Sequence, residues 1–194
     1  MISKIQNILP EHNIKITESK KIFIIDYKNL NGGEVELLEE EPDDIKFVFI
    51  ENIKPIKIAF DGFKDNALPI KIGEYSRQCE CVLFPELYKD NNWILFIETK
   101  YANNLRAAFN DNSDYPNNMI EQITETVKYF REKKIIPENK RVSAIVSFPN
   151  LIEEFNSFFN QDQLVEILLN QKILIRATNS AIVISEKRIR LNSI

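Results

Sequence analysis

Short runs of β-branched and aromatic residues dominate the first third of the chain. Turn-forming residues such as Asn31-Gly32-Gly33 and Asp61-Gly62 separate these runs, which is the pattern of successive β-strands. The predicted strands span residues 14–18, 21–27, 34–39, 45–51 and 54–60. Residues 2–9 are predicted to form a short leading helix that Pro10 ends. We expect this region to be a sheet extension or a small lobe laid against a core.

The middle of the chain alternates between strand and helix patterns. Residues 74–84 and 93–101 are predicted strands, joined by a polar turn. Residues 117–134 are a predicted helix with Asn117 as its N-cap, and 141–148 follow as an apolar strand. The apolar stripe of this helix recurs at helical spacing and consists of Ile120, Ile123, Val127 and Phe130.

The C-terminal segment combines helices with strands. Residues 150–160 and 161–171 are predicted helices, and 172–177 and 181–186 are the predicted strands of a β-hairpin. The whole pattern indicates an α/β fold with a central mixed β-sheet flanked by helices. At 194 residues, the chain is expected to form a single domain over 1–194. Its expected parts are a β-rich N-terminal extension (1–70), a core (71–148) and C-terminal helices with the hairpin (149–194).

The composition is typical of a globular protein, with 44% hydrophobic and 28% charged residues. No window approaches the roughly 18 unbroken apolar residues of a membrane span. The N-terminus lacks the long apolar stretch of a signal peptide, so residence in the cytoplasm is the expectation. A net charge of −4 argues against nonspecific coating of nucleic acid, although it leaves room for one local basic cleft.

The two cysteines, Cys79 and Cys81, are separated by one residue. In an extended strand both would point to the same face, where a disulfide between them would distort the backbone. With His12 as the single histidine, a four-ligand zinc site has too few donors. The cysteines are therefore predicted to be small buried side chains that pack on one sheet face.

The predicted strand 93–101 ends in a charged pair. Its two faces are both apolar for the first five residues, which marks a central strand that is covered on both sides. Glu98 and Lys100 then share one face at its end. Burying a carboxylate and an ammonium is costly, so such a pair persists where it is matched, coordinates a metal or has a function.

An acidic residue, Glu80, lies on the preceding predicted strand. If the two strands are neighbours, Glu80 and Glu98 converge at one end of the sheet. Two convergent carboxylates repel each other unless a cation sits between them, and a hard divalent ion with oxygen ligands is the natural occupant.

An acidic residue on one strand, a turn, and then an acidic residue, any residue and Lys on the next strand together resemble the PD-(D/E)XK nuclease superfamily. Here the motif is Glu80, then Glu98-Thr99-Lys100, and the resemblance covers roughly residues 73–148. It implies a restriction-endonuclease-like core and hydrolysis of phosphodiester bonds. Members often carry a Gln on the helix after the second strand, and Gln122 fits that position.

The resemblance also implies the role of each residue. Glu80 and Glu98, with the backbone carbonyl of Thr99, would hold Mg²⁺ or Mn²⁺. Lys100 would orient or deprotonate the attacking water and offset charge in the transition state. Gln122 would position Lys100 or the water. The substrate would be DNA rather than RNA, and the expected phosphate contacts are Arg106, Lys128 and Arg131.

Three departures keep other functions open. The first acid is Glu where Asp is commoner, no proline precedes it, and the segment before it offers no helix-borne Glu. A catalytically inactive nuclease-fold domain that binds a protein or nucleic-acid partner is therefore the main alternative. A scaffold protein in which the Glu98–Lys100 pair is incidental is a third reading. A homodimer also stays open, since nucleases that cut both strands often act as dimers.

Overall fold

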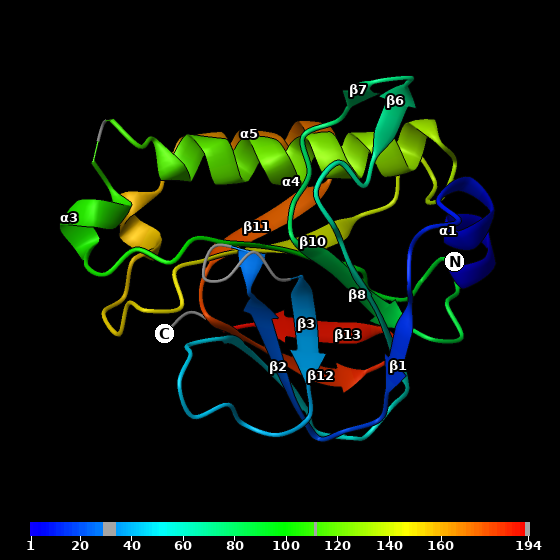
Figure 1. The fold of residues 1–194 in the computed structure, drawn as a ribbon, viewed down its shortest axis with the longest axis horizontal. Helices are drawn as coiled ribbons and strands as arrows, with labels where there is room; N and C mark the ends of the chain where they lie inside the picture. The colour runs from blue at the N-terminus through cyan, green and yellow to red at the C-terminus, as the bar shows by residue number, and fades with distance from the viewer. Residues whose placement is uncertain (29–33, 111, 193–194) are drawn as a thin grey trace.

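A computed structural model describes residues 1–28, 34–110 and 112–192 of the chain. Within these residues the fold is α/β, with two mixed sheets, a small two-stranded sheet and four α-helices. Figure 1 shows three layers: two long helices, a six-stranded sheet beneath them, and a five-stranded sheet on its other side. The predicted α/β class with mixed sheet is thus confirmed.

The six-stranded sheet forms the middle layer. Its strands, in spatial order, are β1 (Lys15–Thr17), β5 (Ile58–Gly62), β8 (Cys81–Pro85), β9 (Leu95–Thr99), β10 (Val142–Ser147) and β11 (Ile173–Ala177). The first four strands pair antiparallel, and β9, β10 and β11 pair parallel. The predicted neighbours that carry Glu80 and Glu98 therefore do lie side by side, because β8 pairs with β9.

The five-stranded sheet combines segments from both ends of the chain. Its strands, in spatial order, are β13 (Arg188–Leu191), β12 (Ser180–Ser185), β4 (Val48–Asn52), β2 (Lys21–Asp26) and β3 (Val35–Leu38). Only the β4–β12 pair among them is parallel. The strands of the expected N-terminal extension are therefore divided between two sheets, since β1 and β5 belong to the first.

The predicted hairpin of 172–177 and 181–186 is wrong. β11 completes the edge of the six-stranded sheet, whereas β12 enters the second sheet and makes its hairpin with β13. The intervening Asn179 fixes this change of layer. The Asn179 side-chain amide donates to the backbone carbonyls of Phe148 and Leu151. The Asn179 backbone carbonyl accepts from the Phe49 N–H of β4.

Four helices lie in the described residues. They are α1 (Ile2–Ile8), α3 (Leu105–Ala108), α4 (Tyr115–Glu132) and α5 (Gln161–Gln171). The predicted leading helix and the predicted apolar stripe of α4 are confirmed. However, α4 begins earlier than predicted, with Asp114 rather than Asn117 at the N-cap, because Pro116 is accommodated inside the first turn.

The predicted helix over 150–160 is also wrong. Only a single 3₁₀ turn, η1 (Asn156–Phe158), forms there. Phe155 and Phe159 are buried four residues apart, which imitates the spacing of a helix. Both rings instead pack on Phe148 as separate anchors of an irregular segment.

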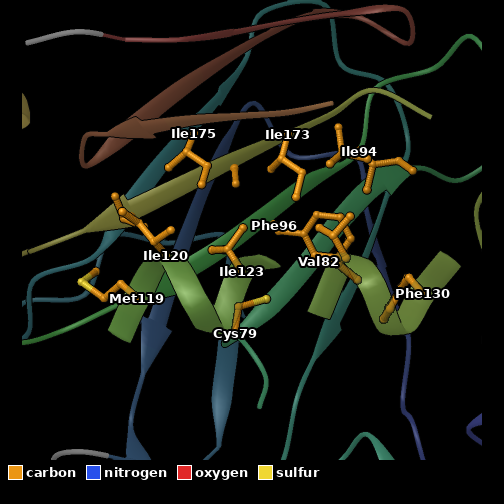
Figure 2. Packing of buried hydrophobic residues seen from close by; sticks show 14 of the residues in the cluster. Cys79, Val82, Ile94, Phe96, Met119, Ile120, Ile123, Phe130, Ile173 and Ile175 are labelled. Atoms are coloured by element: carbon orange, nitrogen blue, oxygen red, sulfur yellow. The ribbon is translucent and has the colours of Figure 1, made fainter. Parts of the chain in front are cut away.

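Two hydrophobic clusters hold the three layers together. One lies between the helices and the six-stranded sheet and includes Phe96, Ile123 and Phe130 (Figure 2). The other lies between the two sheets and includes Leu95 and Ile97. Successive residues of β9 thus enter opposite clusters, so the predicted covering of this strand on both faces is confirmed.

The predicted strand 74–84 is interrupted. Glu74–Tyr75 (β7) pairs with Pro69–Lys71 (β6) as a small hairpin, and regular pairing resumes only at Cys81. Alternation is lost between these points. As a result, Cys79 lies in the cluster under the helices, whereas Cys81 lies in the cluster between the sheets. The cysteines are buried and free, as predicted, but they do not share a face.

None of the helices in the described residues is both long enough and apolar enough to cross a membrane.

Candidate functional site

The end of β9 places a buried acid beside a lysine. Glu98 is 0% exposed, because β9 is covered by the helices on one side and by the second sheet on the other. The Nζ atom of Lys100 lies 2.5 Å from Glu98 Oε1. The other carboxylate oxygen, Oε2, is buried without a hydrogen-bond partner in the described structure. Glu98 therefore keeps one lone-pair-rich atom available inside the protein.

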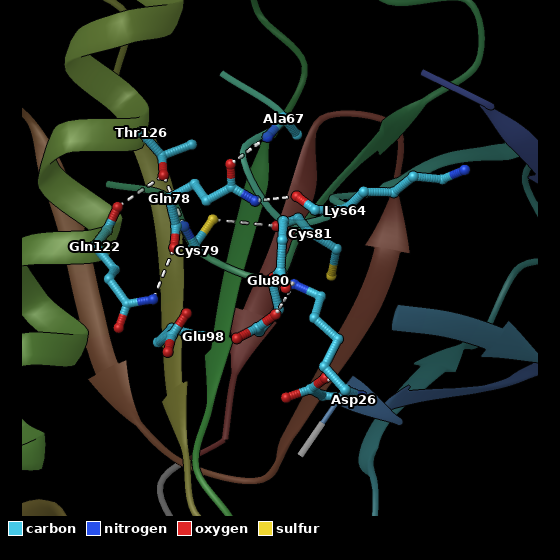
Figure 3. Close-up of polar contacts among 12 residues, drawn as sticks. Asp26, Lys64, Ala67, Gln78, Cys79, Glu80, Cys81, Glu98, Gln122 and Thr126 are labelled. Carbon is cyan, nitrogen blue, oxygen red and sulfur yellow. Dashed lines mark hydrogen bonds and ion pairs between the residues drawn. The ribbon is translucent and has the colours of Figure 1, made fainter. Parts of the chain in front are cut away.

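Glu80 meets this pair from the neighbouring strand. Its backbone N–H donates to the Ile97 carbonyl of β9 at 2.9 Å, which fixes the start of β8 against the end of β9. Its Oε1 atom lies 3.9 Å from the Lys100 Nζ atom. The expected convergence of Glu80, Glu98 and Lys100 is therefore confirmed by the distances. Figure 3 shows the side chains of Glu80 and Glu98 on their neighbouring segments.

The electrostatics of the cluster reflect its burial. Desolvation, and then the charge of Glu80, raise the pKa of Glu98 well above its ordinary value despite the attraction of Lys100. Desolvation likewise raises the pKa of Glu80, although Lys28 and Lys100 oppose that shift. For Lys100 burial acts in the opposite direction, yet the two glutamates outweigh it and its pKa is raised. Lys100 thus stays charged, whereas burial makes the ionised forms of Glu80 and Glu98 less favourable.

A second lysine, Lys28, joins the cluster from the other sheet. It follows β2, and its Nζ atom lies 2.7 Å from Glu80 Oε2. Asp26, the last residue of β2, is fully buried and accepts a hydrogen bond from the Lys28 backbone N–H at 2.9 Å. The sequence prediction missed both residues. Their signal was present, because Asp26-Tyr27-Lys28 ends a buried strand with the same acid–any–lysine spacing as Glu98-Thr99-Lys100.

Helix α4 anchors the segment that leads into Glu80. The Gln122 side-chain amide donates to the Gln78 carbonyl at 2.7 Å. One turn later, the Thr126 hydroxyl accepts from the Cys79 backbone N–H at 2.8 Å and donates to the Gln122 carbonyl (Figure 3). The Gln122 side chain therefore contacts the backbone that leads into β8, and it positions Glu80 through that backbone.

The cluster opens onto a cleft of about 800 Å³. The groups of the cluster that line it are Glu80, Lys28, Lys100 and Gln122. Arg77 lines it too and pairs with Glu121 of α4. Polar and aromatic side chains complete the walls, among them Tyr75, Tyr115 and Asn118. Glu80 and Lys100 therefore face a water-accessible hollow, whereas Glu98 is not among the residues that line it and contacts the lining through Lys100.

The three predicted phosphate-contact residues are not among those that line this cleft. Arg106 is exposed on α3, and Lys128 is exposed on α4, where it pairs with Glu125. Arg131 donates to the carbonyls of Lys140 and Gln171 and so ties the end of α4 to neighbouring loops. The cations at the cleft are Lys28, Arg77 and Lys100 instead.

Two tyrosines are among the described residues that line the cleft. Tyr115 does so from the first turn of α4, and Tyr75 does so from β7. The Tyr101 hydroxyl donates to the Lys46 carbonyl and accepts from the Asp26 N–H, and the Tyr129 hydroxyl donates to the Pro69 carbonyl. Tyr101 and Tyr129 therefore serve packing and hydrogen bonding.

The donor set fits a hard divalent cation only if solvent and substrate supply part of the coordination. No group of three His, Cys, Asp or Glu side chains suited to a metal is found among the described residues. Glu80 and Glu98 both approach the Lys100 Nζ atom, and the unpartnered Glu98 Oε2 is a candidate oxygen ligand. Mg²⁺ commonly binds through one or two carboxylates and keeps several waters, so Glu80 and Glu98 are the residues that would hold it here.

Comparison of the chain with protein-family models, with curated proteins and with solved structures gave no match.

A separate polar pair lies outside this cluster. His12 Nδ1 lies 2.8 Å from Asp61 Oδ2, and His12 Nε2 donates to the Ala67 carbonyl at 3.1 Å. Asp61 is fully buried on β5, and its Oδ1 atom has no partner in the described structure. No function is predicted for His12 from the sequence. The structure shows that it ties the segment after α1 to β5.

Proposed function

We propose that this protein is a metal-dependent nuclease with a restriction-endonuclease-like core. The observation that carries the proposal is the convergence of Glu80, Glu98 and Lys100 at the ends of two adjacent buried strands, where Glu80 and Lys100 line an open cleft. Buried carboxylates with raised pKa values in a cleft are a recurring property of active sites. DNA is the substrate that the resemblance to PD-(D/E)XK nucleases favours over RNA.

The order of the elements supports the same proposal. The resemblance calls for a strand with an acid, a turn, a strand with the acid–any–lysine motif, and a helix with a Gln. In the chain these are the start of β8, the turn after it, the end of β9, and α4 with Gln122. β8 and β9 are hydrogen-bonded neighbours, and the Glu80 N–H donates to the Ile97 carbonyl, so the pairing of these segments supports the meeting of the motif residues.

In this proposal Glu80, Glu98 and the Thr99 carbonyl hold Mg²⁺ or Mn²⁺. The ion would polarise the scissile phosphate and lower the pKa of a bound water. Lys100, which Glu98 orients at 2.5 Å, offsets the negative charge that develops on the phosphate and guides the water. Gln122 positions Glu80 through the Gln78 carbonyl. The cleft supplies the room in which the nucleic-acid strand lies.

A second candidate is a nuclease-fold domain that binds a partner without cleavage. Its specific support is that each glutamate of the cluster already has a lysine within hydrogen-bond distance, so each carboxylate is charge-paired without a metal. Helix α1 also carries no acidic residue that would complete the ligand set. In this reading the ion pairs stabilise the junction between the sheets, and the cleft binds its partner without chemistry.

Cleavage of supercoiled plasmid DNA in Mg²⁺ or Mn²⁺ tests the proposal. The wild type is compared with Glu98→Gln, Lys100→Met and the control Lys57→Met, which removes an exposed lysine that lies 4.0 Å from Glu86. We expect the two site variants to lose cleavage by about 10²-fold or more, while the control keeps it. Equal cleavage by all four proteins would assign the activity to a contaminant. Absent cleavage with retained DNA binding would favour the second candidate.

A further inference from the structure

Lys28 occupies an unusual place for a residue of the second sheet. Most of that sheet packs against the apolar back of the six-stranded sheet, but the end of β2 carries Lys28 around to the cleft. There its Nζ atom lies 2.7 Å from Glu80 Oε2 and 3.8 Å from the exposed Asp65. Its side chain is 17% exposed, so it borders the cleft without being freely solvated.

The backbone around Lys28 holds this position. The Asp26 carboxylate accepts a hydrogen bond from the Lys28 backbone N–H. The Tyr101 hydroxyl donates to the Lys46 backbone carbonyl and accepts from the Asp26 backbone N–H. Tyr101 directly follows Lys100, so the two acid–any–lysine segments are linked by this hydroxyl. The arrangement places one lysine on each side of Glu80, from two different sheets.

We propose that Lys28 is a substrate-binding residue that holds Glu80 in the ion-free protein and contacts the nucleic-acid phosphate once a divalent cation takes Glu80. This inference rests on the proposed nuclease function. Lys100 is committed to Glu98, at 2.5 Å, whereas its distance to Glu80 is 3.9 Å. Lys28 is therefore the ammonium that competes most directly with a cation for Glu80.

The charges of the cluster explain why the exchange would occur. Four carboxylates, Asp26, Asp65, Glu80 and Glu98, act on the two ammonium groups of Lys28 and Lys100, which leaves the described cluster with a formal excess of two negative charges. A divalent ion offsets this excess and, by taking Glu80, removes the nearest anionic partner of Lys28. A phosphate in the cleft then offers Lys28 a new anionic partner, and charge-assisted contacts of this kind are strong.

Two binding measurements on the full chain test the proposal without relying on cleavage. Isothermal titration calorimetry with Mn²⁺ alone measures the cation site. Fluorescence anisotropy with a labelled DNA oligonucleotide in Ca²⁺, over a series of salt concentrations, measures phosphate contacts. The variants are Lys28→Met, with Lys28→Gln as a polar second version, Lys28→Arg to keep the charge, and Lys57→Met as the control for loss of one exposed lysine. Circular dichroism establishes that each variant is folded.

We expect loss of the Lys28 charge to change the affinities for Mn²⁺ and for DNA in opposite directions. Lys28→Met should bind Mn²⁺ more tightly than the wild type, because a competitor for Glu80 is gone. It should bind DNA about tenfold more weakly, with the salt dependence reduced by about one counterion. Lys28→Arg and Lys57→Met should resemble the wild type in DNA binding. If Lys28 had a purely structural role, its replacement would lower stability without strengthening Mn²⁺ binding while weakening DNA binding.

Two outcomes would overturn the inference, and they are distinguishable. If folded Lys28→Met and Lys28→Gln bind Mn²⁺ and DNA as the wild type does, Lys28 has no such role, and the proposed function stands on Glu80, Glu98 and Lys100. If the wild type itself binds neither Mn²⁺ nor DNA, the proposed function fails and the inference fails with it.

Discussion

Glu98 is the residue at which stability and the proposed function oppose each other most directly. Its carboxylate is fully buried, and only one of its two oxygens has a partner in the described structure. Leaving a buried polar atom unpaired costs about 1–3 kcal/mol. Its raised pKa expresses the same cost, since the folded protein disfavours the ionised form. Proteins retain such groups where a ligand or a reaction needs them.

Replacement of Glu98 by Gln should therefore stabilise the protein at neutral pH. A carboxyl whose pKa is raised on folding is more protonated in the folded state, so the free energy of unfolding falls as pH rises from the unfolded pKa towards the folded one. Glu98→Gln removes this loss, and we expect a gain of about 1–3 kcal/mol at neutral pH that shrinks on acidification. Urea denaturation measures it, with exposed Glu51→Gln as the matched control. A destabilised Glu98→Gln would show that the ionised pair holds the fold together.

His12 also makes the stability of the protein depend on pH, but here a favourable contact with Asp61 raises the pKa, whereas burial raises that of Glu98. Burial alone would lower the pKa of His12, but the hydrogen bond and the charge of Asp61, with the Ala67 carbonyl, outweigh burial and raise it. A histidine with a raised pKa stabilises the fold fully below its unfolded pKa, near 6.5, and that contribution is lost as pH rises through the folded value. We predict that wild-type stability falls over this interval.

The variant His12→Asn should lack that pH dependence. It should also be about 1–3 kcal/mol less stable than the wild type at pH near 6, because the buried Asp61 carboxylate loses its partner. Chemical denaturation at several pH values around 6.5 and above measures both effects. An unchanged slope in His12→Asn would mean that another group titrates over this interval.

At the scale of elements, helix α4 holds in place the backbone segment that precedes β8. Its Gln122 and Thr126 side chains bind the backbone of residues 78 and 79, where the strand pairing is interrupted. The hydrogen bonds that a regular strand would make are thus replaced by helix side chains. This irregular backbone is what turns Glu80 towards the cluster.

Loss of the Thr126 hydroxyl should lower the free energy of unfolding, because it removes one of these hydrogen bonds. Thr126→Val keeps the shape of the side chain but leaves the buried Cys79 N–H without its acceptor, at a cost of about 1–3 kcal/mol. Thr124→Val is the matched control, because that hydroxyl bonds only to the Glu121 carbonyl of the same helix. Thermal denaturation compares the two. Equal losses in both variants would show that the Thr126–Cys79 hydrogen bond contributes nothing specific.

The glycine that ends β5 should tolerate no side chain. A Cβ at Gly62 would lie 2.7 Å from the Val35 carbonyl and 2.9 Å from the Phe60 ring, so the backbone of β3 would have to shift. We predict a loss of about 1–3 kcal/mol for Gly62→Ala. Gly73 has open space but a positive φ of 75°, and Gly73→Ala should cost only about 1 kcal/mol of backbone strain. A smaller loss at Gly62 than at Gly73 would contradict this account.

The accuracy of the sequence prediction follows the range of the interactions that fix each feature. Periodicity found α4, β9 and the pair Glu98 and Lys100, because alternation along one strand determines their faces. Periodicity failed at Cys79, where a side chain of α4 replaces the strand pairing. Alternation along one strand also does not show that Lys28 reaches the cluster, although Asp26 and Lys28 repeat the acid–any–lysine spacing, because that contact depends on β2 belonging to a second sheet laid against the first.

At the scale of the whole molecule, the two large sheets depend on each other. The second sheet contains residues from both ends of the chain, and the parallel pairing of β4 with β12 joins them. Its inner face is covered by the six-stranded sheet through Leu83, Leu95 and Ile97. Separating the layers would expose this apolar surface, at about 25 cal/mol for each Å². Neither sheet is therefore expected to persist without the other.

The single tryptophan makes this dependence measurable. Trp93 is buried in the cluster between the sheets, and its indole N–H donates to the Ser185 carbonyl of β12 at 2.9 Å. Its fluorescence reports the junction, whereas far-ultraviolet circular dichroism reports all elements. We predict that the two urea transitions coincide, as cooperative unfolding requires. A fluorescence transition that precedes the circular dichroism transition would show that the second sheet separates first, and Lys28 would then leave the cleft before Glu80 and Glu98 lose their places on the remaining sheet.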